Sequence, residues 1–327
     1  MARLVLLLIL LLAALPAGAV GFQQAEVPDP ADRPIEVGIW YPSDAPASPQ
    51  MLWPYRQVVA PGGALRGNRL PVVLISHGTG GSYAGHWDTA HALAAAGFVA
   101  IGVLHTGDNI RDQSYSGAAR GFGERTRHLK LVLDWLLAEW PDHAKLDPGR
   151  VGAFGFSAGG FTVLAAAGGT PDIARGRLHC ATQPSDPSCR LAKPNPTEAD
   201  QRAEWVRETR LRAVVAVAPA LGWSFIGRGL AGLEVPVQLW RPAADEVLQH
   251  PWNAELVRRS LPRPPEMHVV PRAGHYAFLA PCPDGMAAAV PEICTDAAGF
   301  DRAAFHRELN RAVVGFFRTT LKQGAMP

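Results

Sequence analysis

Apolar residues in this chain gather in short continuous runs, and amphipathic stretches separate the runs. A short run rich in β-branched residues and bounded by turn residues is typical of a strand buried on both faces of a parallel sheet. Residues 70–76 form such a run, and further strands are predicted at residues 98–104, 150–156, 211–218, 235–240 and 266–270. Residues 35–41 instead alternate in polarity, which predicts one more strand that ends at Pro42.

Apolar residues three or four positions apart indicate helices between these strands. The clearest case is 124–139, where the apolar positions are Leu129, Val132, Leu133, Leu136 and Leu137. Further helices are predicted at 86–96, 157–167, 252–261 and 301–321. Because strands and helices alternate, the predicted fold class is α/β, with a mostly parallel, doubly wound sheet.

Three segments interrupt this pattern. Residues 170–210 are largely polar, and we interpret them as a lid-like insertion with a polar helix around 197–210. Residues 20–34 are rich in Pro, Asp and Gln and are predicted to be an exposed lead-in, whereas 42–69 are predicted to be loop with room for one edge strand. Because no repeat or linker divides them, residues 20–327 are interpreted as a single domain.

The first 19 residues have the pattern of a secretory signal peptide. Arg3 is followed by an apolar run, residues 4–15, and then by small residues that end at Ala19. The run is short for a bilayer span, so cleavage after Ala19 is predicted and an uncleaved membrane anchor is the alternative. The predicted location is therefore periplasmic or extracellular.

Composition and charge narrow the function classes. Apolar residues make up 48% of the chain, and the net charge is +2 with acids and bases interspersed. This balance gives no support for a nucleic-acid partner or for binding to an anionic membrane surface. The oligomeric state has no signal in the sequence.

The four cysteines, all after residue 19, are interpreted as structural. They allow three disulfide pairings, and the sequence does not choose among them. Pairing Cys180 with Cys189 and Cys282 with Cys294 is the simplest, since each bond would close one local loop in an oxidising compartment. Without a Cys-x-x-Cys or a Cys/His cluster, no metal site is predicted.

Residues 151–161 are predicted to be a buried strand that turns sharply into a helix. Gly155, Ser157 and Gly159 match Gly-x-Ser-x-Gly, the nucleophile elbow of α/β-hydrolases. Small residues are needed on either side of the serine because the strained turn leaves no space for larger ones. Ser157 is therefore the candidate nucleophile.

A serine nucleophile needs a base, and the base needs a residue that orients it, in the chain order Ser, Asp or Glu, His. His275 lies just beyond the last predicted strand and is the candidate base. The other histidines after Ser157 are His179, His250, His268 and His306. Of these, His179 lies in the insertion, His268 in a strand pattern and His306 in a helix pattern. Asp245 follows strand 235–240 and is the candidate acid, with Glu246 and Asp172 as rivals.

The glycine-rich segment 77–81 follows the strand predicted to lie beside the elbow strand. Its backbone N–H groups can turn toward a developing oxyanion, and one such donor typically contributes about 10²–10³ in rate. We assign the oxyanion hole to the N–H groups of Thr79 and Ala158. A phosphate-binding loop is excluded, because no Gly-x-Gly-x-x-Gly opens the first strand–helix unit and the chain has no Gly-Lys-Ser/Thr.

Two further segments have open interpretations. Residues 105–109 follow a strand and are either part of the pocket wall or a structural turn. Trp223 and Phe225 could form an acyl-pocket wall, although with nine tryptophans in the chain core packing is the simpler interpretation.

Taken together, the motifs resemble those of bacterial exported hydrolases related to platelet-activating-factor acetylhydrolase and dienelactone hydrolase. The resemblance extends over nearly all of the chain after residue 19, and the segments that carry it are 33–42, 76–81, 105–109, 155–160 and 273–282. The resemblance implies a cofactor-free Ser-Asp-His esterase and agrees with Ser157, Asp245, His275, Thr79 and Ala158. Dienelactone hydrolases use a cysteine nucleophile, so their lactone specificity does not carry over to Ser157.

The predicted function is therefore an exported serine hydrolase of carboxylic esters. A preference for short acyl chains follows from the resemblance and from the lack of a long apolar lid. The alternatives are a serine peptidase or amidase on the same fold and a noncatalytic binding protein. The expected partner is a small-molecule ester, and no cofactor or metal is expected.

Overall fold

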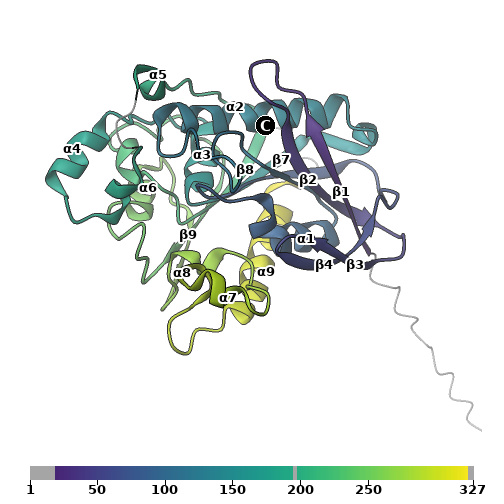
Figure 1. Cartoon of the computed structure of the whole chain (residues 1–327). Helices are drawn as coiled ribbons and strands as arrows, with labels where there is room; N and C mark the ends of the chain where they lie inside the picture. The colour runs from purple at the N-terminus through teal and green to yellow at the C-terminus, as the bar shows by residue number, and fades with distance from the viewer. Residues whose placement is uncertain (1–18, 194–196, 323–327) are drawn as a thin grey trace, which may run out of the picture.

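The computed structural model describes residues 19–193 and 197–322, so the predicted signal peptide, except for Ala19, lies outside the described residues. One mixed sheet of ten strands runs through the molecule in the order β10-β9-β8-β7-β5-β6-β2-β1-β4-β3 (Figure 1). The strands span Ala19–Val27, Ile35–Ser43, Ser48–Leu52, Tyr55–Pro61, Leu70–Ser76, Val99–Val103, Leu146–Phe156, Leu211–Val217, Val237–Pro242 and Glu266–Val270 for β1 to β10.

The six strands from β6 to β10 in this order are parallel, and β2 joins them antiparallel to β6. All seven residues of β5 are buried, as expected for a central strand covered on both faces. The predicted α/β class with a mostly parallel sheet is thus confirmed, and β10 has the predicted bounds.

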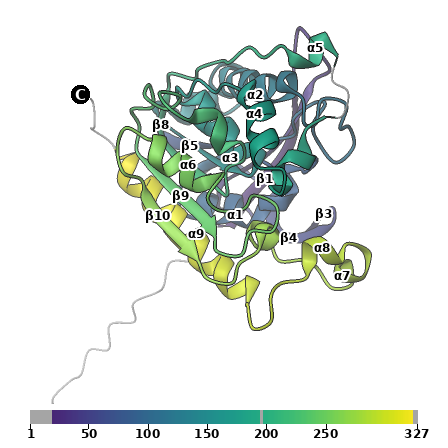
Figure 2. The same cartoon turned by 90° about the vertical axis from the view of Figure 1, so that its left-hand side faces the viewer.

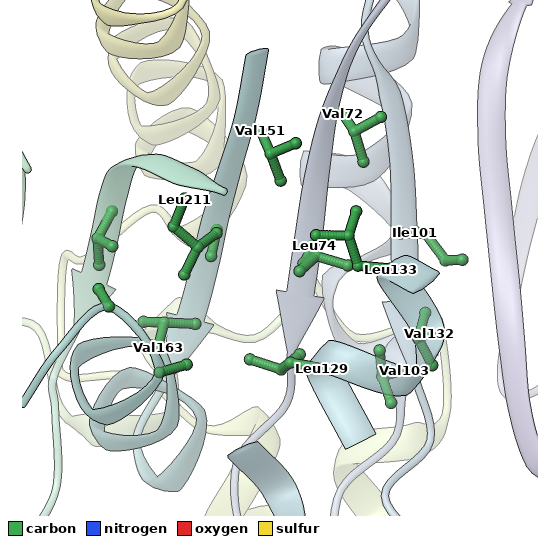
Figure 3. Close-up of a cluster of buried hydrophobic side chains, with 14 of the residues drawn as sticks. Val72, Leu74, Ile101, Val103, Leu129, Val132, Leu133, Val151, Val163 and Leu211 are labelled. Carbon is green, nitrogen blue, oxygen red and sulfur yellow. The ribbon is translucent and has the colours of Figure 1, made fainter. Parts of the chain in front are cut away.

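Helices cover both faces of the sheet. They span Trp87–Ala95, Ala119–Ala138, Ala158–Ala166, Arg175–Thr182, Glu198–Gln201, Ala254–Ser260, Met286–Ala289, Pro291–Cys294 and Arg302–Thr320 for α1 to α9. In Figure 1, α2 and α3 lie above the sheet and α1 and α9 below it. One apolar cluster fills the α2 and α3 side, where Leu129 and Leu133 of α2 face Leu74 of β5 (Figure 3).

The N-terminal prediction was wrong for residues 20–27. They are not an exposed lead-in but most of β1, which pairs antiparallel with β2 along its whole length. Phe22 packs on Trp40, with ring centroids 4.8 Å apart, and a side chain at Gly21 would collide with Tyr41. Polar composition concealed this strand, because its stability comes from pairing with the next strand, β2, and composition does not report that pairing.

Residues 42–69 contain two strands rather than one, since β3 and β4 form an antiparallel pair at the sheet edge. In the insertion, the polar helix predicted around 197–210 is reduced to α5, Glu198–Gln201, and residues 203–208 are irregular. Helix α4 lies at the left edge of Figure 1 and faces the viewer in Figure 2. No helix among the described residues is long and apolar enough to cross a membrane.

Candidate active site

Ser157 stands between strand β7 and helix α3, at the sharp turn that the motif predicts. Its φ of 56° and ψ of −118° lie outside the regions that most residues adopt, and this strain is typical of functional turns. A Cβ at Gly159 would lie 1.9 Å from the Ser76 carbonyl oxygen, and one at Gly155 would lie 2.1 Å from the Gly159 carbonyl oxygen. Both glycines are therefore required by close backbone contacts around the serine.

His275 approaches Ser157 from the loop after β10. It begins a short 3-10 helix, His275–Phe278, and its ring is 2% exposed. Its Nε2 lies 3.1 Å from the Ser157 Oγ, and its Nδ1 lies 3.0 Å from the Asp245 Oδ2. Phe156 packs against the imidazole, with ring centroids 4.8 Å apart, and this contact fixes the plane of the ring.

Asp245 lies in the loop after β9 and is buried. Its Oδ1 accepts hydrogen bonds from the backbone N–H groups of Val247 and Leu248 at 3.0 and 2.6 Å, while Oδ2 faces His275. Burial alone would raise the pKa of Asp245, but the adjacent imidazole and the two N–H donors outweigh it and lower this pKa. Asp245 is thus held as a carboxylate beside the imidazole.

The rivals of Asp245 and His275 have other partners. The Glu246 side chain contacts the backbone of His275, where the Glu246 Oε2 accepts a hydrogen bond from the His275 N–H at 3.0 Å. Asp172 is exposed and pairs with Arg175. Three of the other histidines face carboxylates away from Ser157, in the pairs His179–Asp186, His268–Glu266 and His306–Asp88, and His250 is exposed.

The glycine-rich segment 77–81, which we call the oxyanion loop after its predicted role, lies against the elbow. Strands β5 and β7 are parallel neighbours, and a Cβ at Gly78 would lie 3.3 Å from the Ser157 Cβ. Ala158 is the first residue of α3, so its N–H has no acceptor within the helix. Thr79 is exposed, and its N–H donates to no other group among the described residues.

Residues 105–109 support the oxyanion loop from beneath and do not form an exposed pocket wall. His105, Asp108 and Asn109 are all buried, and the Asp108 Oδ1 accepts from the Gly80 N–H at 2.9 Å. The structural-turn interpretation therefore holds for this segment. Sequence reasoning missed Arg125, whose guanidinium joins this network from α2, because a single arginine among helical polar positions has no distinguishing pattern.

Trp223 and Phe225 are buried rather than lining an open wall. Phe225 packs on Phe161 at 5.2 Å between ring centroids, and Trp223 stacks on His179 at 5.6 Å. Core packing accounts for both residues.

The cysteines pair as Cys180–Cys189 and Cys282–Cys294, the simplest of the three possible pairings. Among the described residues, the ligand atoms of His179, Asp186 and Cys189 lie within 4.8 Å of one another. The Cys189 sulfur is part of the disulfide and cannot act as a thiolate, so the group is a poor metal site.

Comparison with known proteins identifies the fold. The structure is similar to a ferulic acid esterase from Streptomyces cinnamoneus, with a TM-score of 0.66 and 18% identity over 96% of this chain and 93% of that one. A dienelactone hydrolase from Anabaena variabilis gives a TM-score of 0.50 and 16% identity, over 92% of this chain and 98% of that one. A dienelactone hydrolase-like promiscuous phosphotriesterase from metagenomic libraries gives 0.54 and 17%, over 93% and 100%.

No protein-family model and no curated protein sequence matches the chain. The similarity is therefore one of structure, at sequence identities of 16–18%. It agrees with the resemblance inferred from the motifs in the sequence. The chain has the α/β-hydrolase fold of dienelactone hydrolase-like proteins.

Proposed function

We propose that this protein is an exported serine hydrolase that cleaves carboxylic esters through an acyl-enzyme. The observation that carries the proposal is the buried chain of contacts from Ser157 Oγ through His275 to Asp245. These contacts match the nucleophile, base and orienting acid of serine hydrolases in both order and distance. The esterase named among the structural neighbours is in keeping with this reaction.

In the proposed mechanism, the His275 Nε2 takes the Ser157 hydroxyl proton as the Oγ attacks the ester carbonyl. Asp245 keeps the remaining ring proton on Nδ1 and stabilises the imidazolium. The N–H groups of Thr79 and Ala158 hold the oxyanion. His275 then protonates the leaving alcohol, and a water molecule activated by the same imidazole hydrolyses the acyl-enzyme. No step requires a cofactor.

The proposal also includes export of the protein and a preference for small substrates. Two disulfides agree with an oxidising compartment outside the cytoplasm, as the predicted signal peptide implies. Preference for short acyl chains rests on the sequence resemblance, and faster turnover of p-nitrophenyl octanoate than of the acetate or butyrate would contradict it.

The test compares hydrolysis of p-nitrophenyl acetate, butyrate and octanoate by the wild type and by Ser157→Ala. Loss of at least ~10³-fold in kcat/KM in the variant is expected, because the nucleophile is removed. Equal inertness of both proteins would instead favour a noncatalytic binding protein. Faster cleavage of aminoacyl amides than of esters would favour a peptidase or amidase.

A further inference from the structure

A fully buried arginine lies directly beneath the oxyanion loop. Arg125 of α2 donates from Nη1 to the His77 carbonyl oxygen at 2.7 Å and from Nη2 to the Gly78 carbonyl oxygen at 3.1 Å. Its Nε donates to the Asp108 Oδ2 at 2.8 Å. A guanidinium is charged at any ordinary pH and is costly to bury, so a site that encloses one completely uses each of its donors.

We propose that Arg125 and Asp108 are positioning residues that set the direction of the Thr79 N–H in the oxyanion hole. They act through the loop backbone and do not touch the substrate. The inference rests on the proposed function, because a direction for this N–H matters only if an oxyanion forms beside Ser157.

The peptide unit between Gly78 and Thr79 is held in place through its carbonyl oxygen. In a trans peptide the carbonyl and the N–H point in opposite directions. Three donors converge on the Gly78 carbonyl oxygen: Arg125 Nη2 at 3.1 Å, the His77 Nδ1–H at 2.7 Å and the Gly81 N–H at 3.1 Å. Since the carbonyl is held toward the buried guanidinium, the Thr79 N–H points away from it, on the side where Thr79 is exposed.

The peptide unit after Thr79 is held in place through its N–H group, that of Gly80. The Asp108 Oδ1 accepts from the Gly80 N–H at 2.9 Å, while the Asp108 Oδ2 accepts from Arg125. One ion pair therefore holds the peptide groups on both sides of Thr79. Gly80 has φ +64°, a conformation that glycine adopts without strain, so the loop can take the required turn.

A neutral His77 completes the arrangement. Its Nδ1 donates to the Gly78 carbonyl, and its Nε2 accepts from the His105 backbone N–H at 3.3 Å, which assigns the tautomer from the hydrogen-bond pattern. Burial, together with the Arg125 charge, lowers the pKa of His77 to about 3. The imidazole therefore stays neutral and keeps its two different roles at ordinary pH.

The test uses Arg125→Gln and Asp108→Asn in the full-length protein, with Arg302→Gln as the matched control. Arg302 is also buried and also joins a carboxylate, Asp296, to a backbone carbonyl, that of Ile293 in α8. It contacts no residue of the oxyanion loop. For each variant we would measure kcat, KM, the melting temperature and the inhibition constant of a trifluoromethyl ketone, which forms a tetrahedral oxyanion on a serine nucleophile.

Arg125→Gln is expected to lower kcat by about 10²–10³, the effect of losing one oxyanion donor, with KM changed by less than about threefold. Binding of the ketone should weaken by a similar factor. Arg302→Gln should lower the melting temperature but leave kcat and ketone affinity at wild-type values. A purely structural role for Arg125 would not produce the parallel loss of kcat and ketone affinity.

If Arg125→Gln does not fold, Asp108→Asn gives the same readout, because an asparagine preserves the shape and weakens the hold on Gly80. The proposal is overturned if the variants that fold retain wild-type ketone affinity, or if their activity falls only in proportion to melting temperature, as in the control. Failure of the proposed function is distinguishable, because the wild type would then have no Ser157-dependent turnover before any loop variant is compared.

Discussion

Two histidine–carboxylate pairs in this molecule have similar geometry, yet their surroundings give the two imidazoles different capacities for accepting a proton. In both pairs an imidazole Nδ1 meets a carboxylate, at 3.0 Å for His275–Asp245 and at 2.7 Å for His306–Asp88, where Asp245 is buried and Asp88 half-buried. The difference lies at the second ring nitrogen. The His275 Nε2 faces the Ser157 hydroxyl, whereas the His306 Nε2 faces the Ala277 carbonyl oxygen at 3.0 Å.

A hydroxyl can give a proton to an imidazole, but a carbonyl oxygen can only accept a hydrogen bond. The His306 ring therefore has no proton source at Nε2, and it anchors α9 to the short helix that carries His275. A His–Asp pair is therefore a candidate for catalysis only when the group at the imidazole Nε2 can give up a proton. The pair distance alone does not separate the two cases.

The strongest way to break the comparison is to change both carboxylates to amides. Asp245→Asn should lower kcat by about 10³–10⁴, because the asparagine amide can donate to Nδ1 and favour the tautomer whose Nε2 cannot accept the serine proton. Asp88→Asn should change kcat by less than about tenfold and lower the melting temperature instead. Esterase rates and thermal denaturation of the two variants provide the measurement. Equal losses of kcat would contradict the distinction drawn between the pairs.

Glu246 offers a sharper and smaller test, since it is adjacent to Asp245 and also contacts His275. Within the described part of the chain, its carboxylate accepts only the His275 backbone N–H, and a glutamine oxygen can accept the same bond. Glu246→Gln should therefore lower kcat by tenfold at most, as measured on p-nitrophenyl acetate. A loss as large as that of Asp245→Asn would identify Glu246 as the orienting acid.

The smallest effect on activity is expected at His86, another buried histidine. Its ring packs between Phe154 and Phe156, and among the described residues neither ring nitrogen has a hydrogen-bond partner. Burial lowers the pKa of His86 to about 4, whereas an unfolded histidine has a pKa near 6.5. As the pH falls from 6.5 toward 4, the unfolded chain binds a proton at this position that the folded protein does not bind.

His86 therefore lowers the free energy of unfolding as the pH falls from 6.5 toward 4. Above pH 6.5 its full contribution to stability is present. His86→Leu removes the group and should reduce the slope of unfolding free energy against pH by up to about 1.4 kcal/mol per pH unit between pH 4 and 6.5. Urea denaturation at several pH values measures the slope, and kcat at pH 7.5 should be unchanged. An unaltered slope would show that His86 binds its proton equally in both states.

The parts of the fold that sequence predicted well are those with local signals. A continuous apolar run such as 70–76 identifies β5, because a strand buried on both faces is built mainly of apolar residues. Ser157 also has a local signal, since the collisions around Gly155 and Gly159 demand glycine at fixed spacing. The chain order brought Asp245 and His275 into consideration, and the structure brings both to Ser157, although their catalytic roles remain a proposal.

The parts that sequence missed depend on contacts between segments, which local patterns do not report. β1 is a strand because it pairs with β2, and its polar composition conceals this. Arg125 matters through its contacts with residues 77 and 78, nearly 50 positions away in the chain, at separations of 48 and 47 residues. Neither periodicity nor a motif can report such contacts, because the arginine occupies an ordinary helical position.

The central claim, that Ser157 is a nucleophile activated by His275, is tested most directly by labelling with a fluorophosphonate followed by intact-mass and peptide analysis. One adduct per wild-type molecule is expected, located at Ser157, and no adduct is expected in Ser157→Ala. In His275→Gln the adduct should form at least ~10³-fold more slowly, because the base is absent. Labelling at another serine, or unchanged labelling of His275→Gln, would contradict the account.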